Sequence, residues 1–87
     1  MNGIEKSGLE EAIKYLNKRG YINKGYKFSS SVMLPDPETD ECKGYEYSFI
    51  KQEDDGASEI RIWYEIEDGG KVSCRGSDKI KMEKNYF

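Results

Sequence analysis

The chain has 87 residues, of which 36% are hydrophobic and 36% are charged, so it has room for one modest hydrophobic core. No apolar run approaches the roughly 18 residues that a membrane-spanning helix needs. The stretch MNGIEKSGLEE also lacks the apolar centre of a signal peptide. We therefore expect a single small domain over residues 1–87 that is soluble and cytoplasmic.

The net charge of −3 is distributed unevenly along the chain. Residues 1–34 carry six basic and three acidic side chains, residues 35–70 carry three and twelve, and residues 71–87 carry five and two. The acidic excess therefore lies wholly in the middle segment, and both flanking segments are basic. Such a segment favours contact with a basic surface on another molecule, because opposite charges speed encounter and select partners.

The first predicted element is an amphipathic helix. Ser7 and Glu10 have the spacing of a capping box, which indicates a start at Ser7, with a start nearer Asn2 as the alternative. Gly20 suits the left-handed position that ends a helix, with Tyr21 directly after it. The side chains that form the apolar stripe at helical spacing are Leu9, Ala12, Ile13 and Leu16.

Alternation of apolar and polar side chains then predicts a series of β-strands. The breaks between them contain residues that turn the chain, namely two prolines, an Asp-Gly pair and a Gly-Gly pair. The tail, residues 78–87, alternates as well and is expected to be a fifth edge strand or a short helix. The other expected strands span residues 26–34, 42–52 and 58–67, followed by one that begins at 72.

This order of elements predicts an α+β fold, with an N-terminal helix packed on one face of a four- to five-stranded antiparallel β-meander. In the first strand, alternate residues from Tyr26 to Leu34 are expected to share one face. The sheet face opposite the helix is expected to be wet. The residues expected beneath the helix are Tyr45, Tyr47, Ile60, Ile62, Tyr64 and Ile66.

Residues 43–50, KGYEYSFI, resemble the RNA-stacking strand of RNA-recognition-motif and cold-shock domains. The resemblance consists of Lys43, Gly44, Tyr45 and Tyr47, and it implies a platform on which single-stranded nucleic acid stacks. The remaining positions differ from the motif, and the acidic segment around the strand would repel phosphates. We therefore expect a core strand here, with a single-stranded nucleic-acid-binding domain as the alternative function.

Catalysis has little support in the sequence. The chain contains no histidine, which removes the commonest general base and leaves Cys42 and Cys74 without a histidine to activate them. Their spacing matches no zinc motif, and cytosolic thiols are usually reduced, with a disulfide as the alternative. Carboxylates at 36, 38 and 40 begin like a calcium loop, but the later glycine and glutamate are absent. We expect no enzyme, cofactor or metal.

The remaining candidate is Trp63, which alternation places on the wet face among Arg61 and Glu65. A large aromatic ringed by charge is typical of a protein-binding hot spot, and the alternative is that it packs beneath Tyr86 and Phe87. By analogy of size and charge, we expect a small acidic inhibitor, phage anti-defence, anti-CRISPR-like or immunity-protein-like, whose partner is a nuclease or another nucleic-acid-binding protein with a basic surface. The expected partner-binding residues are Trp63, Glu65, Glu67, Glu53, Asp54, Asp55, Asp36, Glu38 and Asp40.

Overall fold

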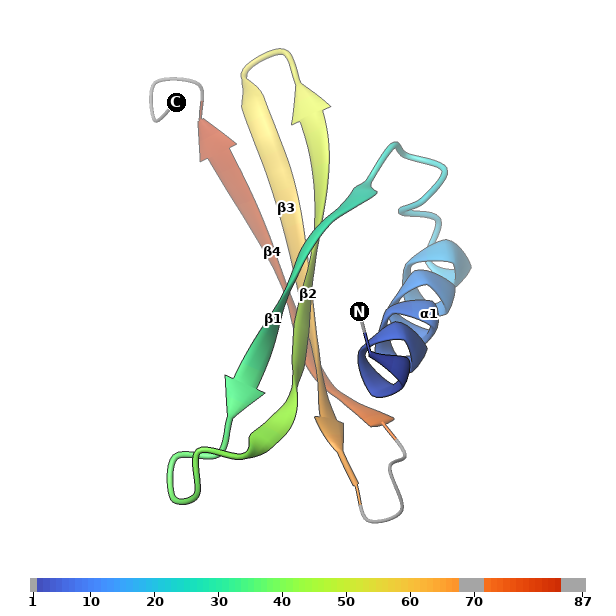
Figure 1. The fold of residues 1–87 in the computed structure, drawn as a ribbon. Coiled ribbons are helices and arrows are strands. Elements are labelled where there is room, and N and C mark those ends of the chain that lie inside the picture. Colours follow the sequence, from blue (N-terminus) through green and yellow to red (C-terminus); the bar gives the residue numbers. More distant parts are fainter. Residues whose placement is uncertain (1, 68–71, 84–87) are drawn as a thin grey trace.

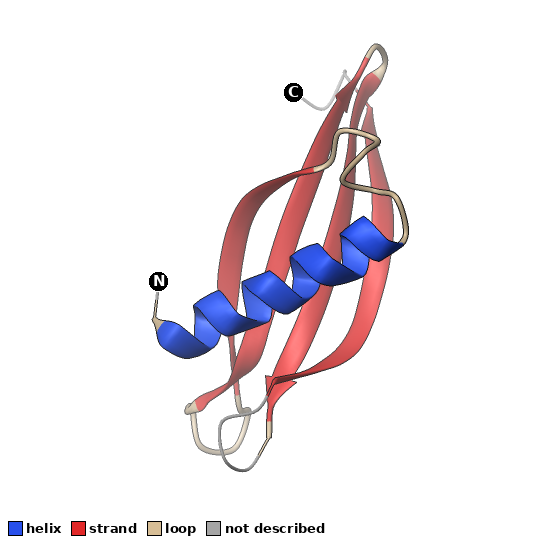
Figure 2. Cartoon of the chain, turned by 90° about the vertical axis from the view of Figure 1, so that its right-hand side faces the viewer, coloured by secondary structure: helices blue, strands red, loops and turns tan. Residues whose placement is uncertain are grey.

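The computed structural model describes residues 2–67 and 72–83 (Figure 1). The strands form one antiparallel sheet in the order β1-β2-β3-β4, and the helix lies obliquely across one face of it (Figure 2). The α+β meander predicted from the sequence is therefore confirmed, with four strands among the described residues. The elements are α1 (Gly3–Lys18), β1 (Lys27–Pro35), β2 (Cys42–Glu53), β3 (Gly56–Ile66) and β4 (Val72–Glu83).

The segment expected to form a fifth strand or a short helix belongs to β4 as far as Glu83. β4 pairs with β3 along its whole length, with one register shift that leaves Arg75 as an extra residue. Such a bulge increases the local twist of a strand. The expected turn at 68–70 and residues 84–87 lie outside the described residues.

The helix begins before the position expected from the capping-box spacing, so the cap predicted at Ser7 is wrong. Asn2 is the N-cap, and its Oδ1 accepts a hydrogen bond from the backbone N–H of Glu5 at 2.8 Å. The Nδ2 of Asn2 also donates to the hydroxyl of Tyr45 on β2 at 2.8 Å. The sheet therefore holds the cap in place, and Ser7 lies exposed within the helix.

The end of the helix has the glycine that was predicted. Gly20 has a φ of 79°, and its N–H donates to the carbonyl of Asn17 at 3.0 Å. The N–H of Tyr21 donates to the carbonyl of Leu16 at 2.9 Å. These two bonds form a Schellman motif, which satisfies carbonyl groups that a helix end otherwise leaves unpaired.

The hydrophobic core lies between α1 and the central strands. Gly8 lets the helix approach the sheet closely, because a Cβ at this position would lie 2.2 Å from the hydroxyl oxygen of Tyr47. Of the six residues expected beneath the helix, five are buried and Ile66 is half-buried, whereas Ile13 of the predicted stripe is 40% exposed. The buried cluster consists of Ala12, Leu16, Tyr26, Tyr45, Tyr47, Phe49, Ile60, Ile62 and Tyr64.

Strand β1 does not keep the single face that was expected of residues 26–34. Its register with β2 is interrupted at Ser29, which forms a bulge after Phe28. An extra residue reverses the faces taken by the side chains that follow it. By their pairing with β2, Phe28 and Met33 therefore lie on the helix face and Val32 lies on the opposite face. The prediction failed because the alternation of this strand gives no sign of the bulge.

The buried tyrosines give the fold an expected sensitivity to alkaline pH. Burial raises the pKa of Tyr47 to about 12 and also raises the pKa of Tyr64, whereas tyrosine in an unfolded chain titrates near 10. The unfolded chain then loses these protons at lower pH than the folded protein. The contribution of these groups to stability is therefore complete below about pH 10 and is lost as the pH rises towards 12.

Urea unfolding at several pH values between about 8 and 12 measures this loss. Tyr47→Phe, which lacks one of the titrating hydroxyls, is the matched control and should show a shallower decline of the unfolding free energy with pH. The same slope in the variant and the wild type would contradict the assignment to Tyr47.

Candidate protein-binding site

The sheet face away from α1 carries Trp63. Its neighbours across the strands are Glu46 on β2 and Gly76 on β4. A Cβ at Gly76 would lie 2.2 Å from the indole Cζ2 atom, so the ring packs directly over this glycine. The indole is half-buried, which means that the edge strand supports it while part of it stays accessible. Tyr86 and Phe87, the other expected neighbours of Trp63, lie outside the described residues.

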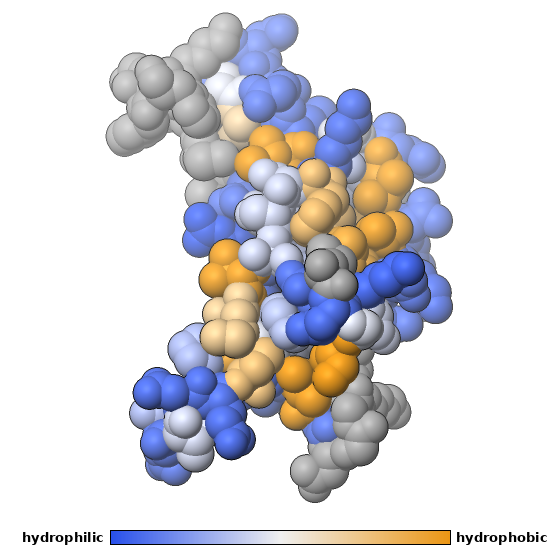
Figure 3. Space-filling model, viewed as in Figure 1, coloured by the Kyte–Doolittle hydropathy of each residue, from blue (hydrophilic) through white to orange (hydrophobic). Residues whose placement is uncertain are grey.

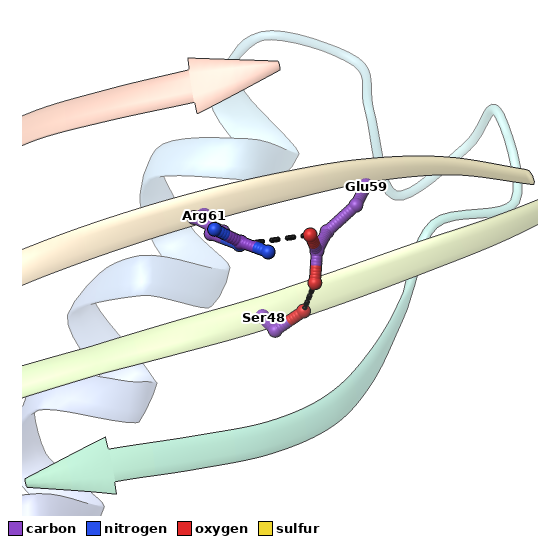
Figure 4. Close-up of polar contacts among 3 residues, drawn as sticks. All are labelled: Ser48, Glu59 and Arg61. Atoms are coloured by element: carbon purple, nitrogen blue, oxygen red, sulfur yellow. Dashed lines mark hydrogen bonds and ion pairs between the residues drawn. The ribbon is translucent and has the colours of Figure 1, made fainter. Parts of the chain in front are cut away.

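A polar cluster that was not predicted from the sequence lies beside Trp63. It consists of Ser48, Glu59 and Arg61 (Figure 4). Glu59 is buried although it lies on the face away from the helix. One carboxylate oxygen accepts the Nε–H of Arg61 at 2.8 Å, and the other accepts the hydroxyl of Ser48. A buried carboxylate needs such partners because leaving water is costly for a charge. The cluster therefore fixes Arg61, and its sequence signal was the same-face spacing of Glu59 and Arg61 on one strand.

Five of the nine expected partner-binding residues lie at one end of the sheet. The loop of residues 36–41 joins β1 to β2 at this end, and β3 also finishes there (Figure 1). Glu65 is half-buried and its Oε1 lies 3.5 Å from the Nζ of Lys43, while the exposed Glu67 accepts the hydroxyl of Ser73. Together these five residues form what we term the acidic end, which consists of Asp36, Glu38, Asp40, Glu65 and Glu67.

The loop within the acidic end is shaped by its own backbone. The N–H of Asp36 donates to the carbonyl of Glu41 at 2.7 Å, and the Oδ1 of Asp36 accepts the N–H of Glu38 at 2.8 Å. Asp40 has a φ of 60°, a left-handed conformation that aspartate tolerates better than most residues. The side chains of Glu38 and Asp40 remain exposed, so this turn presents carboxylates outward.

The other three acidic residues lie at the opposite end of the sheet, around the β2–β3 hairpin. Glu53 is half-buried and accepts the hydroxyl of Ser58 at 2.8 Å, whereas Asp54 and Asp55 are exposed at the tip. Nine residues of extended chain separate Glu53 from Gly44 on β2, which corresponds to about 30 Å. The structure therefore does not bring Glu53, Asp54 and Asp55 together with the acidic end. Trp63, in contrast, lies near the acidic end, because it precedes Glu65 by two residues on β3.

The two tyrosines of the KGYEYSFI segment lie on the covered face. The side chain of Tyr45 is 7% exposed and that of Tyr47 is 0% exposed. The Tyr47 hydroxyl donates to the backbone carbonyl of Glu5 in α1 at 2.6 Å. A stacking platform needs ring faces that a base can reach, and neither ring offers one beneath the helix.

An open hollow of about 430 Å³ lies beside the end of α1, lined in part by Lys14, Tyr15 and Cys74. The guanidinium of Arg19 lies 3.7 Å from the centroid of the Tyr15 ring.

The two cysteines, Cys42 and Cys74, are both free thiols. In the part of the chain that the structure describes, no group of three or more potential ligand residues is placed to hold a metal. Within the same ranges, no helix is long and apolar enough to cross a membrane.

These features define an α+β protein with one helix-covered sheet face, one tryptophan-bearing face and an acidic end. Comparisons with protein-family models, with curated proteins and with solved structures found no match to this chain.

Proposed function

We propose that the protein is a non-enzymatic binding module that docks its acidic end, together with Trp63, against a basic surface of another protein. The observation that carries the proposal is the convergence of five acidic residues at the end of the sheet nearest the half-buried Trp63. The two parts have different roles. The carboxylates accelerate encounter with a basic partner, and the indole slows dissociation once water is excluded around it.

Arg61 adds a further contact beside the tryptophan. Tryptophan and arginine are the residue types enriched among binding hot spots. Because Glu59 already holds its Nε–H, the Arg61 side chain loses little freedom when a partner carbonyl or carboxylate accepts its remaining N–H groups.

The partner that best fits this surface is a nuclease or another nucleic-acid-binding protein. Such proteins hold phosphates with lysine and arginine side chains, and carboxylates can occupy the same positions in place of phosphate. The protein would then act in the cytoplasm as a competitive inhibitor, of the kind found among phage anti-defence and immunity proteins. That placement follows from size and charge alone.

The test begins with capture of the partner from the native host, identified by mass spectrometry, followed by binding kinetics with purified proteins. Glu38→Lys combined with Glu67→Lys should slow association roughly tenfold at low salt, and added salt should reduce the difference. Asp54→Lys combined with Asp55→Lys makes the same change in net charge at the far end of the sheet and should leave association nearly unchanged.

Trp63→Ala should leave the association rate nearly unchanged and increase the dissociation rate by at least about tenfold. A DNA or RNA oligonucleotide should compete with the protein for the partner if the two share a phosphate-binding groove. Unchanged association in the Glu38→Lys/Glu67→Lys variant, together with unchanged dissociation in Trp63→Ala, would remove the proposal. Loss of competition alone would remove only the inhibitor role.

A further inference from the structure

The two edges of the sheet differ in their protection against added strands. Edge strands commonly carry charges, prolines or bulges, because bare edges pair with other chains. β4 carries charged residues at five of its twelve positions, whereas residues 28–34 of β1 carry no charge. The bulge at Ser29 and the proline at 35 limit the open part of β1 to residues 30–34.

This open part of β1 also exposes large apolar side chains. Val32 is 56% exposed and Met33 is 50% exposed, and the register places them on opposite faces of the sheet. Apolar residues come to the surface along β1 in the space-filling view (Figure 3). A strand added at this edge would gain backbone hydrogen bonds and would cover an apolar side chain on each face.

The position of α1 decides between two occupants of the edge. The first turn of the helix reaches past β1 (Figure 2), and Glu5 accepts the hydroxyl of Ser31 beneath it. Antiparallel pairing of two copies through β1 would place both helices on the same face of a joined sheet, with both helix starts at the junction. A single extended segment would meet only one helix start, which makes it the sterically simpler occupant.

Charges at the two ends of β1 indicate the chemistry of such a segment. Lys27 begins the strand, and the loop with Glu38 and Asp40 follows it. A strand added antiparallel to β1 would begin beside this acidic loop and finish beside Lys27. The complementary segment therefore has basic residues at its N-terminal side, followed by apolar residues at neighbouring positions, because Val32 and Met33 lie on opposite faces.

We propose that the edge of β1 binds an extended segment of a partner protein by strand addition, with basic residues of the segment beside Glu38 and Asp40. The basic character of the segment rests on the proposed function, because both assign a basic partner to the acidic end. The strand pairing itself rests on the uncharged edge and on the exposure of Val32 and Met33.

The probe is a phage-displayed library of random twelve-residue peptides, selected against the full wild-type chain. Selected peptides should carry lysine or arginine ahead of neighbouring β-branched or aromatic residues. Val32→Lys should weaken their binding at least about tenfold, because lysine on an edge strand opposes pairing. Ile13→Lys, which makes the same kind of change at an exposed site on α1, should leave binding unchanged.

Hydrogen exchange supplies a readout that needs no variant, since bound peptide should slow exchange of amides within residues 30–34. Failure to select any peptide, binding that resists Val32→Lys, or unchanged exchange in β1 would overturn strand addition. A wild-type dimer that Val32→Lys dissociates, measured by light scattering, would overturn the choice of occupant in favour of a second copy.

The same variants separate this inference from the proposed function. An intact partner that depends on Val32 but not on Glu38 or Glu67 would support strand addition and contradict docking through the acidic end. An intact partner that depends on Glu38 and Glu67 but tolerates Val32→Lys would give the opposite result and remove strand addition.

Discussion

Ile62→Ala is expected to lower the free energy of unfolding by about 2–5 kcal/mol. Ile62 is among the largest fully buried side chains, and it pairs with Tyr47 across the two central strands. Removing three of its carbons leaves a cavity that the helix above and the paired strand cannot fill without distortion. A loss of this size is a large share of the stability of a domain of 87 residues. Urea unfolding followed by circular dichroism measures it.

Ile13→Ala is the matched control, because it removes the same atoms from a side chain that is 40% exposed on α1. Alanine also has the higher helix propensity. We expect this variant to differ from the wild type by less than about 1 kcal/mol. If Ile62→Ala lost no more than its control, the assignment of this strand face to the core would be wrong.

Local patterns were sufficient to predict most of the elements. The alternation of β2 and β3 identified their buried faces, because both strands keep an uninterrupted register with each other. Gly20 and Tyr21 identified the end of the helix, since the Schellman motif involves only neighbouring residues. Features that depend on nearby sequence were therefore predictable.

Contacts between distant residues account for what could not be predicted. Ser7 has the spacing of a capping box, but Asn2 becomes the cap while it also bonds Tyr45, which is 43 positions away. The bulge at Ser29 has no counterpart in the alternation of apolar residues. Glu59 was not singled out from the sequence, and only the position of Ser48 on the adjacent strand reveals that its carboxylate is bonded on both sides.

The candidate site was predicted in composition but not in arrangement. The sequence groups twelve acidic residues in one segment, yet strands β2 and β3 carry the two loops to opposite ends of the sheet. The acidic end and the open edge of β1 are contiguous, because β1 continues directly into the loop with Glu38 and Asp40. A partner with a basic, extended segment could therefore contact both surfaces at once.

Gly44→Ala is expected to destabilise the fold by an amount on the order of 3 kcal/mol, although it adds only one carbon atom. A Cβ at Gly44 would lie 2.0 Å from the carbonyl oxygen of Tyr64 and 3.0 Å from the Cα of Glu65. Both are backbone atoms of β3, which cannot swing aside as the end of a side chain can. The two strands would have to separate locally, with weaker hydrogen bonds between them.

Gly3→Ala is the control, because a Cβ at Gly3 meets nothing within 4 Å, and the residue does not have a positive φ.

The difference in stability between Gly44→Ala and Gly3→Ala also tests why the KGYEYSFI motif has its glycine. Close approach of β2 and β3 explains its glycine, and burial beneath α1 explains Tyr45 and Tyr47, so packing accounts for these residues without a nucleic-acid ligand. A Gly44→Ala variant as stable as Gly3→Ala would show that packing does not require this glycine, and the resemblance to the stacking strand would then need another cause.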